Sequence, residues 1–346
     1  MTKPTHILVL RLSALGDVAM VVPVLRVVTQ TYPELTLTVV SRPTYKPIFE
    51  GLPNINFIEA DVYGKHKGLG LLGLARAGKK AGANAVADLH NVIRSKIITG
   101  YLSTMGLKTA TIDKGRAEKK ALTQASNKKF EPIKTTHQRY ADVFASLGYP
   151  IDLKQHIFPE RKELTPALTA VIGKHFKKII GVAPFAAFSG KMYPMDLMKK
   201  VIATLSTEGA YQVILFGGGE KEKKELDALQ DSHENVISMA GRFSLKEELA
   251  LISNLDVMLS MDSGNGHLAA LYGIPTVTLW GVTHPYAGFA PFGQPRANSL
   301  CADREQYPLI PTSVYGNKQP QGYEKAMHSI SPESIVAKVK DAINFQ

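Results

Sequence analysis

Short apolar runs alternate with longer amphipathic stretches along most of the chain. In the first half, runs rich in β-branched and other apolar residues fall at 6–10, 35–40, 55–58, 85–89 and 108–112, and stretches with helical periodicity separate them. Strands that alternate with helices in this way predict βαβ units, and therefore a parallel sheet covered by helices.

The same rhythm restarts in the second half, after an irregular, proline-bearing stretch at 153–167 that is typical of a linker. Its predicted strands are 178–183, 212–216, 236–238, 256–260 and 276–280. A Gly- and Pro-rich stretch then runs to about Met327. The tail "SPESIVAKVKDAINF" predicts a helix with Ser331 as N-cap and Pro332 at its first position, and its apolar face comprises Ile335, Val339, Ala342 and Ile343. The pattern therefore indicates two doubly wound domains in tandem.

Length and composition agree with this interpretation. A chain of 346 residues is long for one core, and 45% hydrophobic with 21% charged residues is typical of a soluble globular protein. The single cysteine, Cys301, excludes an intramolecular disulfide and a cysteine-rich metal site, which favours a reducing compartment. No run of apolar residues is long enough to span a membrane, so we expect a cytoplasmic protein.

The formal net charge of +11 indicates anionic partners. Basic residues gather in two segments of the first half, 64–80 and 112–139, and the first of these contains no acid. A solvated surface is the alternative explanation for each segment.

The stretch "MDSGNGHLAALYGIP" at 261–275 carries an unusual set of residues between a predicted strand and a predicted helix. A helix cap would explain Asp262 or Ser263, but not His267 as well. Gly264 and Gly266 would let a ligand approach the backbone, and the first N–H groups of a helix attract anions. We therefore expect a phosphate at this turn, with Asp262 and His267 binding nearby hydroxyls.

Three other strand-to-helix turns carry charged residues. Lys191 in "APFAAFSGKMYP" could reach a phosphate, and Glu220 after "FGGG" suits a ribose diol. Asp17 follows Gly16 at the start of the first predicted helix, where it could be a base or only a cap. A solvated lysine and an ordinary acidic first helical turn are the alternatives for Lys191 and Glu220.

Two kinds of site are not supported. "GLGLLG" at 68–73 matches G-x-G-x-x-G, but "ADVYGKHK" separates it from the preceding strand, which argues against dinucleotide binding there. The sequence contains no H-E-x-x-H, no D-x-D and no cysteine cluster, so we expect no bound metal.

Several of these stretches resemble the lipopolysaccharide ADP-heptose heptosyltransferase family. The resemblance rests on "RLSALGDVAMVVPVL", "SMDSGNGHLAALYGIPTVTLWGVTHP" and "SVYGNK". It implies the α/β GT-B fold, in which two Rossmann-like doubly wound domains face each other and a C-terminal helix returns to the first domain. The implied domains are an acceptor domain at 1–165, a donor domain at 166–328 and the returning helix at 329–346.

The resemblance also implies an inverting, metal-independent transfer of heptose from ADP-heptose to the inner core of lipopolysaccharide, without a cofactor. By position, Asp17 matches the general base, and the donor-binding residues are Lys191, Glu220, Phe243, Asp262, Ser263, Gly264 and His267. The residues assigned to the acceptor are Arg42, His90, Arg94 and Arg116. Ala186 and Ala187 stand where some relatives have hydroxyl residues on the donor phosphates.

The expected partners are the sugar nucleotide and an anionic lipid A or inner-core acceptor, which implies peripheral contact with the cytoplasmic face of the inner membrane. Two alternatives stay open: a GT-B transferase that uses another sugar nucleotide, and a non-catalytic two-lobed protein that binds a sugar or nucleotide. Nucleic-acid binding would suit the charge, but the sequence lacks an RNP motif or similar aromatic–basic module.

Overall fold

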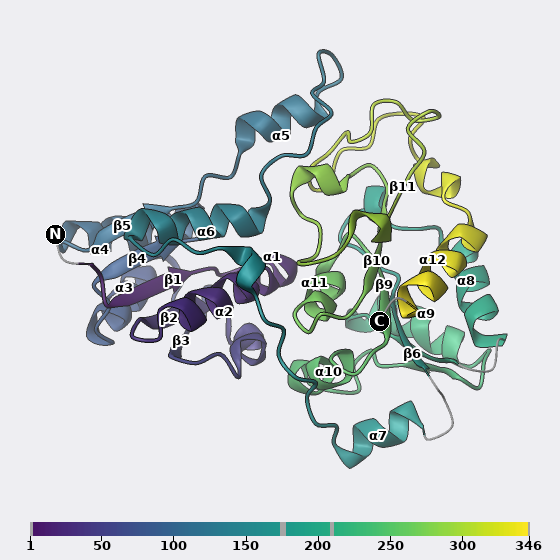
Figure 1. Cartoon of the computed structure of the whole chain (residues 1–346), viewed down its shortest axis with the longest axis horizontal. Coiled ribbons are helices and arrows are strands. Elements are labelled where there is room, and N and C mark those ends of the chain that lie inside the picture. The colour runs from purple at the N-terminus through teal and green to yellow at the C-terminus, as the bar shows by residue number, and fades with distance from the viewer. Residues whose placement is uncertain (1–2, 174–177, 208–210, 345–346) are drawn as a thin grey trace. The chain divides into compact units, whose positions relative to one another are not determined.

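The computed structural model describes residues 3–173, 178–207 and 211–344, so residues 1–2, 174–177, 208–210 and 345–346 of the predicted domains lie outside it. The chain divides into two compact units, and we describe each by itself (Figure 1). Unit 1 consists of Met1–Gly115 and Lys134–Ile157, and unit 2 of Arg116–Ile133 and Phe158–Gln346.

Unit 1 contains a five-stranded parallel sheet with the order β3-β2-β1-β4-β5. Its strands are β1 (His6–Leu10), β2 (Thr36–Ser41), β3 (Ile55–Glu59), β4 (Ala85–Asp88) and β5 (Lys108–Thr111). The helices are α1 (Leu15–Ala19), α2 (Val21–Thr31), α3 (Leu71–Lys80), α4 (Ile93–Thr104) and α6 (Thr136–Leu147), with 3-10 turns η1 (Pro43–Phe49), η2 (Gly68–Gly70) and η3 (Leu153–Gln155). The central strand β1 is wholly buried, as the apolar run predicts.

The helices of unit 1 form two layers. The chain steps from β1 to β2 in one direction along the sheet and from β4 to β5 in the other. Because such crossovers are right-handed, α2 and α4 cover opposite faces. In one layer α3 packs against α4, and in the other α2 packs against α6 (Figure 1).

Unit 2 contains a six-stranded parallel sheet with the order β11-β10-β9-β6-β7-β8. Its strands are β6 (Lys178–Ala183), β7 (Tyr211–Leu215), β8 (Val236–Ser238), β9 (Val257–Met261), β10 (Thr276–Trp280) and β11 (Ser299–Cys301). Its helices are α5 (Arg116–Thr123), α7 (Pro166–Ile172), α8 (Met195–Thr207), α9 (Gly219–Gln230), α10 (Leu245–Ile252), α11 (Gly264–Ala270) and α12 (Pro332–Asn344), and its 3-10 turns are η4 (Ser189–Lys191), η5 (Pro285–Ala287), η6 (Arg296–Asn298) and η7 (Ala326–Ser329).

Each of the ten predicted strands corresponds to a strand of the structure. The prediction missed β11, which has only three residues, is partly exposed and lies in the Gly- and Pro-rich stretch. A short strand with no buried residue carries too little apolar pattern to be recognised, whereas the equally short edge strand β8 has two buried residues.

The C-terminal helix is where it was predicted, and its buried face lies in unit 2. Ser331 accepts a hydrogen bond from the Ser334 N–H at 3.1 Å, as an N-cap does. The buried face of α12 joins the core of unit 2, where the helix lies along α8 and contacts β9 and β10 (Figure 1). Its apolar side chains complete the core of unit 2, and the return of this helix to the first domain stays a prediction.

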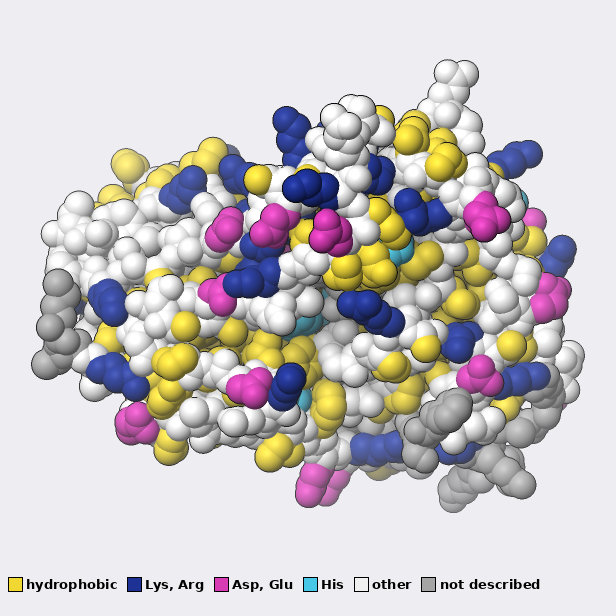
Figure 2. All heavy atoms as spheres, turned by 45° about the horizontal axis from the view of Figure 1, so that its top comes forward, with side chains coloured by type: hydrophobic (Ala, Val, Ile, Leu, Met, Phe, Trp, Pro, Cys, Tyr) yellow, Lys and Arg dark blue, Asp and Glu magenta, His cyan; other side chains and the backbone are white. Residues whose placement is uncertain are grey.

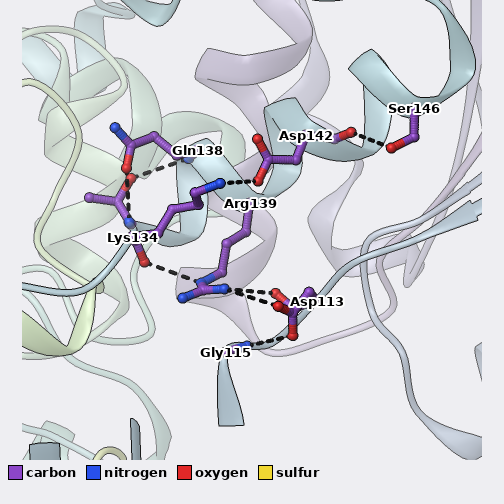
Figure 3. A network of polar contacts seen from close by, with 8 residues as sticks. Asp113, Gly115, Lys134, Gln138, Arg139, Asp142 and Ser146 are labelled. Atoms are coloured by element: carbon purple, nitrogen blue, oxygen red, sulfur yellow. Dashed lines mark hydrogen bonds and ion pairs between the residues drawn. The ribbon is translucent and has the colours of Figure 1, made fainter. Parts of the chain in front are cut away.

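The predicted domain boundary at 165 also differs from the structure, because residues 116–133 belong to unit 2. We call this segment the arm. Buried Arg139 holds the two points where the arm leaves and rejoins unit 1: its Nε donates to the Lys134 carbonyl at 3.2 Å, and its Nη1 lies 3.6 Å from Oδ2 of Asp113 (Figure 3). Asp113 Oδ1 in turn accepts the Gly115 N–H at 2.9 Å.

Within unit 2, the arm is held by its own basic and aromatic side chains. The Lys128 ammonium donates to the carbonyls of Leu122, Leu309 and Pro311 at 2.7–3.0 Å. The Phe130 ring contacts His284 and Tyr286, and the Arg304 guanidinium lies 3.4 Å from its centroid. The sequence analysis associated this lysine-rich segment with anionic partners, or with a solvated surface as the alternative, whereas Lys128 is half-buried and anchors the arm to backbone carbonyls.

Candidate functional site

Asp17 lies in the first turn of α1, at the carboxyl edge of the sheet of unit 1. Its Oδ2 forms an ion pair of 2.7 Å with Nη2 of Arg11, the residue that follows β1. The Arg11 side chain is 8% exposed and the Asp17 side chain 30%, so the carboxylate can still be reached from solvent. The N-cap of α1 is Ala14, without a side-chain hydrogen bond, so Asp17 is not the cap.

Two contacts fix Arg11 and Asp17 further. Arg11 Nη1 donates to the Leu89 carbonyl at 2.8 Å, and the buried Tyr140 hydroxyl donates to the Asp17 carbonyl at 3.3 Å. Burial raises the pKa of Tyr140, which therefore keeps its proton. The position of Asp17 is thus determined by β1, β4 and α6 together.

His90 lies beside this pair and is buried. The Leu12 N–H donates to its Nδ1 at 3.4 Å, which leaves the ring proton on Nε2. Burial, followed by the charge of Arg11, lowers the pKa of His90 to about 3. His90 is therefore a neutral hydrogen-bond donor next to Asp17.

The structure brings together only some of the residues predicted for the acceptor. The Tyr63 ring lies between Arg42 and Arg94, whose guanidinium carbons are 5.4 and 5.2 Å from its centroid. Arg116 lies at the start of α5 in the arm and therefore belongs to unit 2. The sequence analysis did not single out Tyr63, because one aromatic residue in a polar loop gives no signal.

In unit 2, Lys191 and Asp262 come from different strand-to-helix turns and form an ion pair of 2.8 Å at the carboxyl edge of the sheet. Their side chains are 15% and 7% exposed. Both turns were predicted to bind the same ligand. The pair shows that they do lie side by side.

The turn after Asp262 keeps one hydroxyl available. Ser263 is the N-cap residue of the short helix α11, yet its side chain makes no capping bond, and its Oγ is buried without a hydrogen-bond partner among the described residues. His267 is buried on the same helix. Gly266 has a different role from the one expected: a Cβ there would lie 2.5 Å from Ser260 Oγ, so this glycine lets α11 pack on β9.

The "SVYGNK" loop at 313–318 lies against Lys191. A Cβ on Gly316 would lie 2.3 Å from Cγ of Lys191, and one on Gly190 would meet Val282 and the Gly316 carbonyl. Ser313 Oγ accepts the Gly316 N–H at 2.9 Å and so shapes the loop. The loop therefore holds the aliphatic part of Lys191 in place. The glycines at 190 and 316 were the signal that could have revealed this.

The remaining donor residues lie on neighbouring turns of unit 2. Glu220 is exposed in the first turn of α9, while Glu222 accepts the Gly218 N–H at 2.8 Å. Phe243 is half-buried and directly precedes Ser244, the N-cap of α10. The sequence analysis named only Glu220, which faces solvent, and did not consider Glu222, which shapes the turn.

Charge and metal-binding potential complete the description. Figure 2 shows Lys and Arg side chains spread over the face it presents, with hydrophobic atoms between them. Among the residues that the structure describes, no group of three or more His, Cys, Asp or Glu side chains could hold a metal ion. No helix within the same described ranges is long and apolar enough to cross a membrane.

Comparison with known proteins identifies the family. The sequence profile of glycosyltransferase family 9 (heptosyltransferase) matches residues 72–313. The chain belongs to this family. The resemblance inferred from the sequence motifs is therefore confirmed.

Among curated members of family 9, lipooligosaccharide heptosyltransferase 2 of Haemophilus influenzae is 28% identical over 51% of this chain and 49% of its own length. The chain thus spans about half the length of the first curated relatives that it matches. Lipopolysaccharide heptosyltransferase 1 of Campylobacter coli is 24% identical over 81% of this chain and 85% of its own length.

Solved structures confirm the fold. A family 9 glycosyltransferase from Veillonella parvula superposes with a TM-score of 0.74 at 20% identity, covering 99% of this chain and 98% of that one. ADP-heptose lps heptosyltransferase II of E. coli gives a TM-score of 0.69 at 17% identity, covering 98% of this chain and 99% of that one. The two α/β units with parallel sheets thus match heptosyltransferase structures, as the fold class predicted.

Proposed function

We propose that this chain is an inverting glycosyltransferase that transfers heptose from ADP-heptose to the inner core of lipopolysaccharide. Family membership supports glycosyl transfer, and the names of its relatives support heptose and lipopolysaccharide. The observation that carries the proposal is the Lys191–Asp262 pair, together with the adjacent Ser263 hydroxyl, which has no hydrogen-bond partner in the described part of the chain.

These three residues suit the diphosphate of a sugar nucleotide. The Lys191 ammonium has three N–H donors, so it can keep Asp262 and still donate to a phosphate oxygen. Asp262 and the Gly316 loop hold this charge in place before the donor arrives, so that little reorganisation is needed as negative charge grows on the leaving ADP. In this proposal Lys191 supplies the positive charge, and the reaction needs no metal.

Asp17 is the proposed base. In an inverting transfer, the acceptor hydroxyl attacks the anomeric carbon from the face opposite ADP, and the carboxylate takes its proton. Such proton transfer contributes about 10²–10⁴-fold to the rate. Arg11 orients the carboxylate through Oδ2, and the neutral His90 can donate from Nε2 to an acceptor oxygen.

The other predicted residues take supporting roles in this proposal. Glu220 binds the ribose, Phe243 lies against the adenine, and Gly264 and His267 line the sugar. Arg42 and Arg94 bind the anionic acceptor, which is lipid A with its inner-core sugars. Such an acceptor implies a cytoplasmic protein in peripheral contact with the inner membrane.

The test is release of ADP from ADP-heptose, measured with and without a lipid A inner-core acceptor and with EDTA present. The proposal expects acceptor-dependent release that EDTA does not change, and calorimetric binding of ADP in preference to UDP. Preference for UDP would indicate another sugar nucleotide. Binding of ADP-heptose without any transfer would leave a two-lobed binding protein.

A further inference from the structure

Unit 1 carries large apolar side chains that stand in solvent. Leu69 is 86% exposed, Ile93 78%, Tyr63 66% and Ile97 42%. Leucine and isoleucine at such exposure leave apolar area in water, which costs free energy unless another surface covers it.

These side chains belong to the loops and first helical turns at the carboxyl edge of the sheet. Tyr63 and Leu69 lie between β3 and α3, and Ile93 begins α4 directly after the β4 loop. α3 packs against α4, and the Arg76 Nε of α3 donates to the Tyr101 hydroxyl of α4 at 3.4 Å. Tyr63 also lies between Arg42, which follows β2, and Arg94 of α4. We call Tyr63, Leu69, Ile93 and Ile97 the apolar rim.

Most charges around the apolar rim are basic, and the exposed acid of this loop, Asp61, accepts the N–H groups of Gly64 and Lys65. Residues 62–111 contain a single acid, Asp88. Its carboxylate is fully buried and accepts hydrogen bonds from the backbone of His90 and Asn91 and from the Ser95 hydroxyl. In the same stretch, exposed basic residues lie in the loop that carries part of the rim and in α3 and α4, among them Lys65, Lys67, Arg76, Arg94 and Lys96.

We propose that the apolar rim and these basic side chains dock unit 1 on an anionic lipid bilayer. The proposal rests on the proposed function, because an inner-core acceptor is anchored in such a bilayer. Separate apolar tips among lysines and arginines fit a bilayer, whose headgroup layer accepts side chains without matching their shape and whose anionic lipids attract the cations. A protein partner would favour one continuous apolar patch, and a nucleic acid would gain nothing from leucine and isoleucine.

The test measures binding of the full chain to phosphatidylcholine vesicles with and without phosphatidylglycerol. The wild type is expected to bind the anionic vesicles. Leu69→Ser/Ile93→Ser/Ile97→Ser should weaken that binding about tenfold or more, since each serine removes an inserted side chain. Met105→Ser/Ile157→Ser is the matched control, because these residues are also exposed in unit 1 but lie outside the apolar rim, and it should bind as the wild type does.

One further variant separates the contribution of the charges from that of the apolar side chains. Lys65→Gln/Lys67→Gln/Lys96→Gln should weaken binding to anionic vesicles and remove most of its salt dependence. If the apolar triple variant binds as tightly as the wild type, the apolar rim does not insert. Wild-type dimers that the triple variant abolishes would also overturn the proposal, since a second copy would then cover the rim.

Activity measurements distinguish this proposal from the proposed function. The apolar triple variant should keep wild-type ADP affinity and wild-type turnover on acceptor dispersed in detergent, and lose turnover only on acceptor held in vesicles. Absence of wild-type turnover in detergent would overturn the proposed function, whatever the vesicles show. Equal loss in detergent and in vesicles would mean that the rim serves the reaction itself and would overturn docking.

Discussion

Arg11 and Asp17 form an ion pair of 2.7 Å between the residue that follows β1 and the first turn of α1. Since Ala14 is the N-cap of α1, the aspartate is not needed to start the helix. The pair therefore separates two roles for Asp17 that the sequence left open: a cap would satisfy backbone N–H groups, whereas this carboxylate faces a guanidinium and solvent.

Asp17→Asn is expected to lower kcat about 10²-fold or more, because asparagine keeps the shape but cannot take a proton. Loss of the ion pair should lower stability by only about 1 kcal/mol, since Asp17 is partly solvated. Asp113→Asn, which removes an exposed carboxylate from Arg139, is the control and should leave kcat unchanged. The measurements are kcat, ADP affinity and Tm. A near wild-type kcat for Asp17→Asn would remove Asp17 from the mechanism.

Lys191→Met should weaken ADP binding by about 1.5–3 kcal/mol, because a charge-assisted hydrogen bond is lost. It should also lower stability by about 3 kcal/mol, since Asp262 stays buried without its cation. The double variant Lys191→Met/Asp262→Asn separates these effects: it should regain stability in urea unfolding but not ADP affinity in calorimetry. Recovery of ADP binding in the double variant would show that Lys191 does not contact the donor.

Acid should destabilise the protein through buried histidines. Burial is the largest cause that lowers the pKa of His90 to about 3, and of His156 and His284 to about 4, below the ordinary 6.5. Between those values and 6.5 the unfolded chain binds more protons than the folded one, so the free energy of unfolding falls as pH decreases through this window.

The variant that tests this effect is His90→Asn, whose side-chain oxygen can still accept the Leu12 N–H. Urea unfolding from pH 7 to pH about 4.5 should show a shallower loss of stability for His90→Asn than for the wild type. His328→Gln changes an exposed histidine and serves as the control. A slope unchanged by His90→Asn would mean that His90 does not titrate as inferred.

Gly115→Ala should destabilise the point where the arm leaves unit 1. Gly115 has a φ of +59°, and a Cβ there would lie 2.2 Å from the Arg139 guanidinium. Gly106→Ala is matched to it, because Gly106 also has a positive φ, of +82°, but has no atom within 4 Å of the added Cβ. Gly106→Ala should cost about 1–2 kcal/mol for backbone strain. Gly115→Ala should lower the free energy of unfolding in urea by more than this and should expose the arm to limited proteolysis. Equal losses in the two variants would show that the Arg139 side chain moves away from the added Cβ at little cost.

Much of the fold could be predicted because buried parallel strands appear in the sequence as short β-branched runs. The turns at Asp17, Lys191 and Asp262 could be found for a related reason, since parallel strands bring their carboxyl ends to one edge of the sheet. The ion pairs of these residues could not be predicted, because the sequence around Arg11 and Lys191 does not indicate which carboxylate each of them pairs with.

The arm could not be predicted for a different reason. Lys128 donates to carbonyls 181 and 183 positions further along the chain, and lysine-rich sequence is ordinarily solvated. Burial of this ammonium depends on the backbone of a distant loop. Likewise, the helix pattern of α12 defines an apolar face, but it does not say which unit that face completes.

The arm also determines an order of events during synthesis. All of unit 1 has left the ribosome once Ile157 has emerged, and Arg139 can then already join Asp113 to Lys134. The residues that receive the arm, among them Tyr286, Arg304 and Leu309, are made much later. Until then Phe130 lacks the His284, Tyr286 and Arg304 side chains that contact it. Completion of unit 2 therefore waits on a contact between an early segment and a late one, which is the kind of distant pairing that forms slowly.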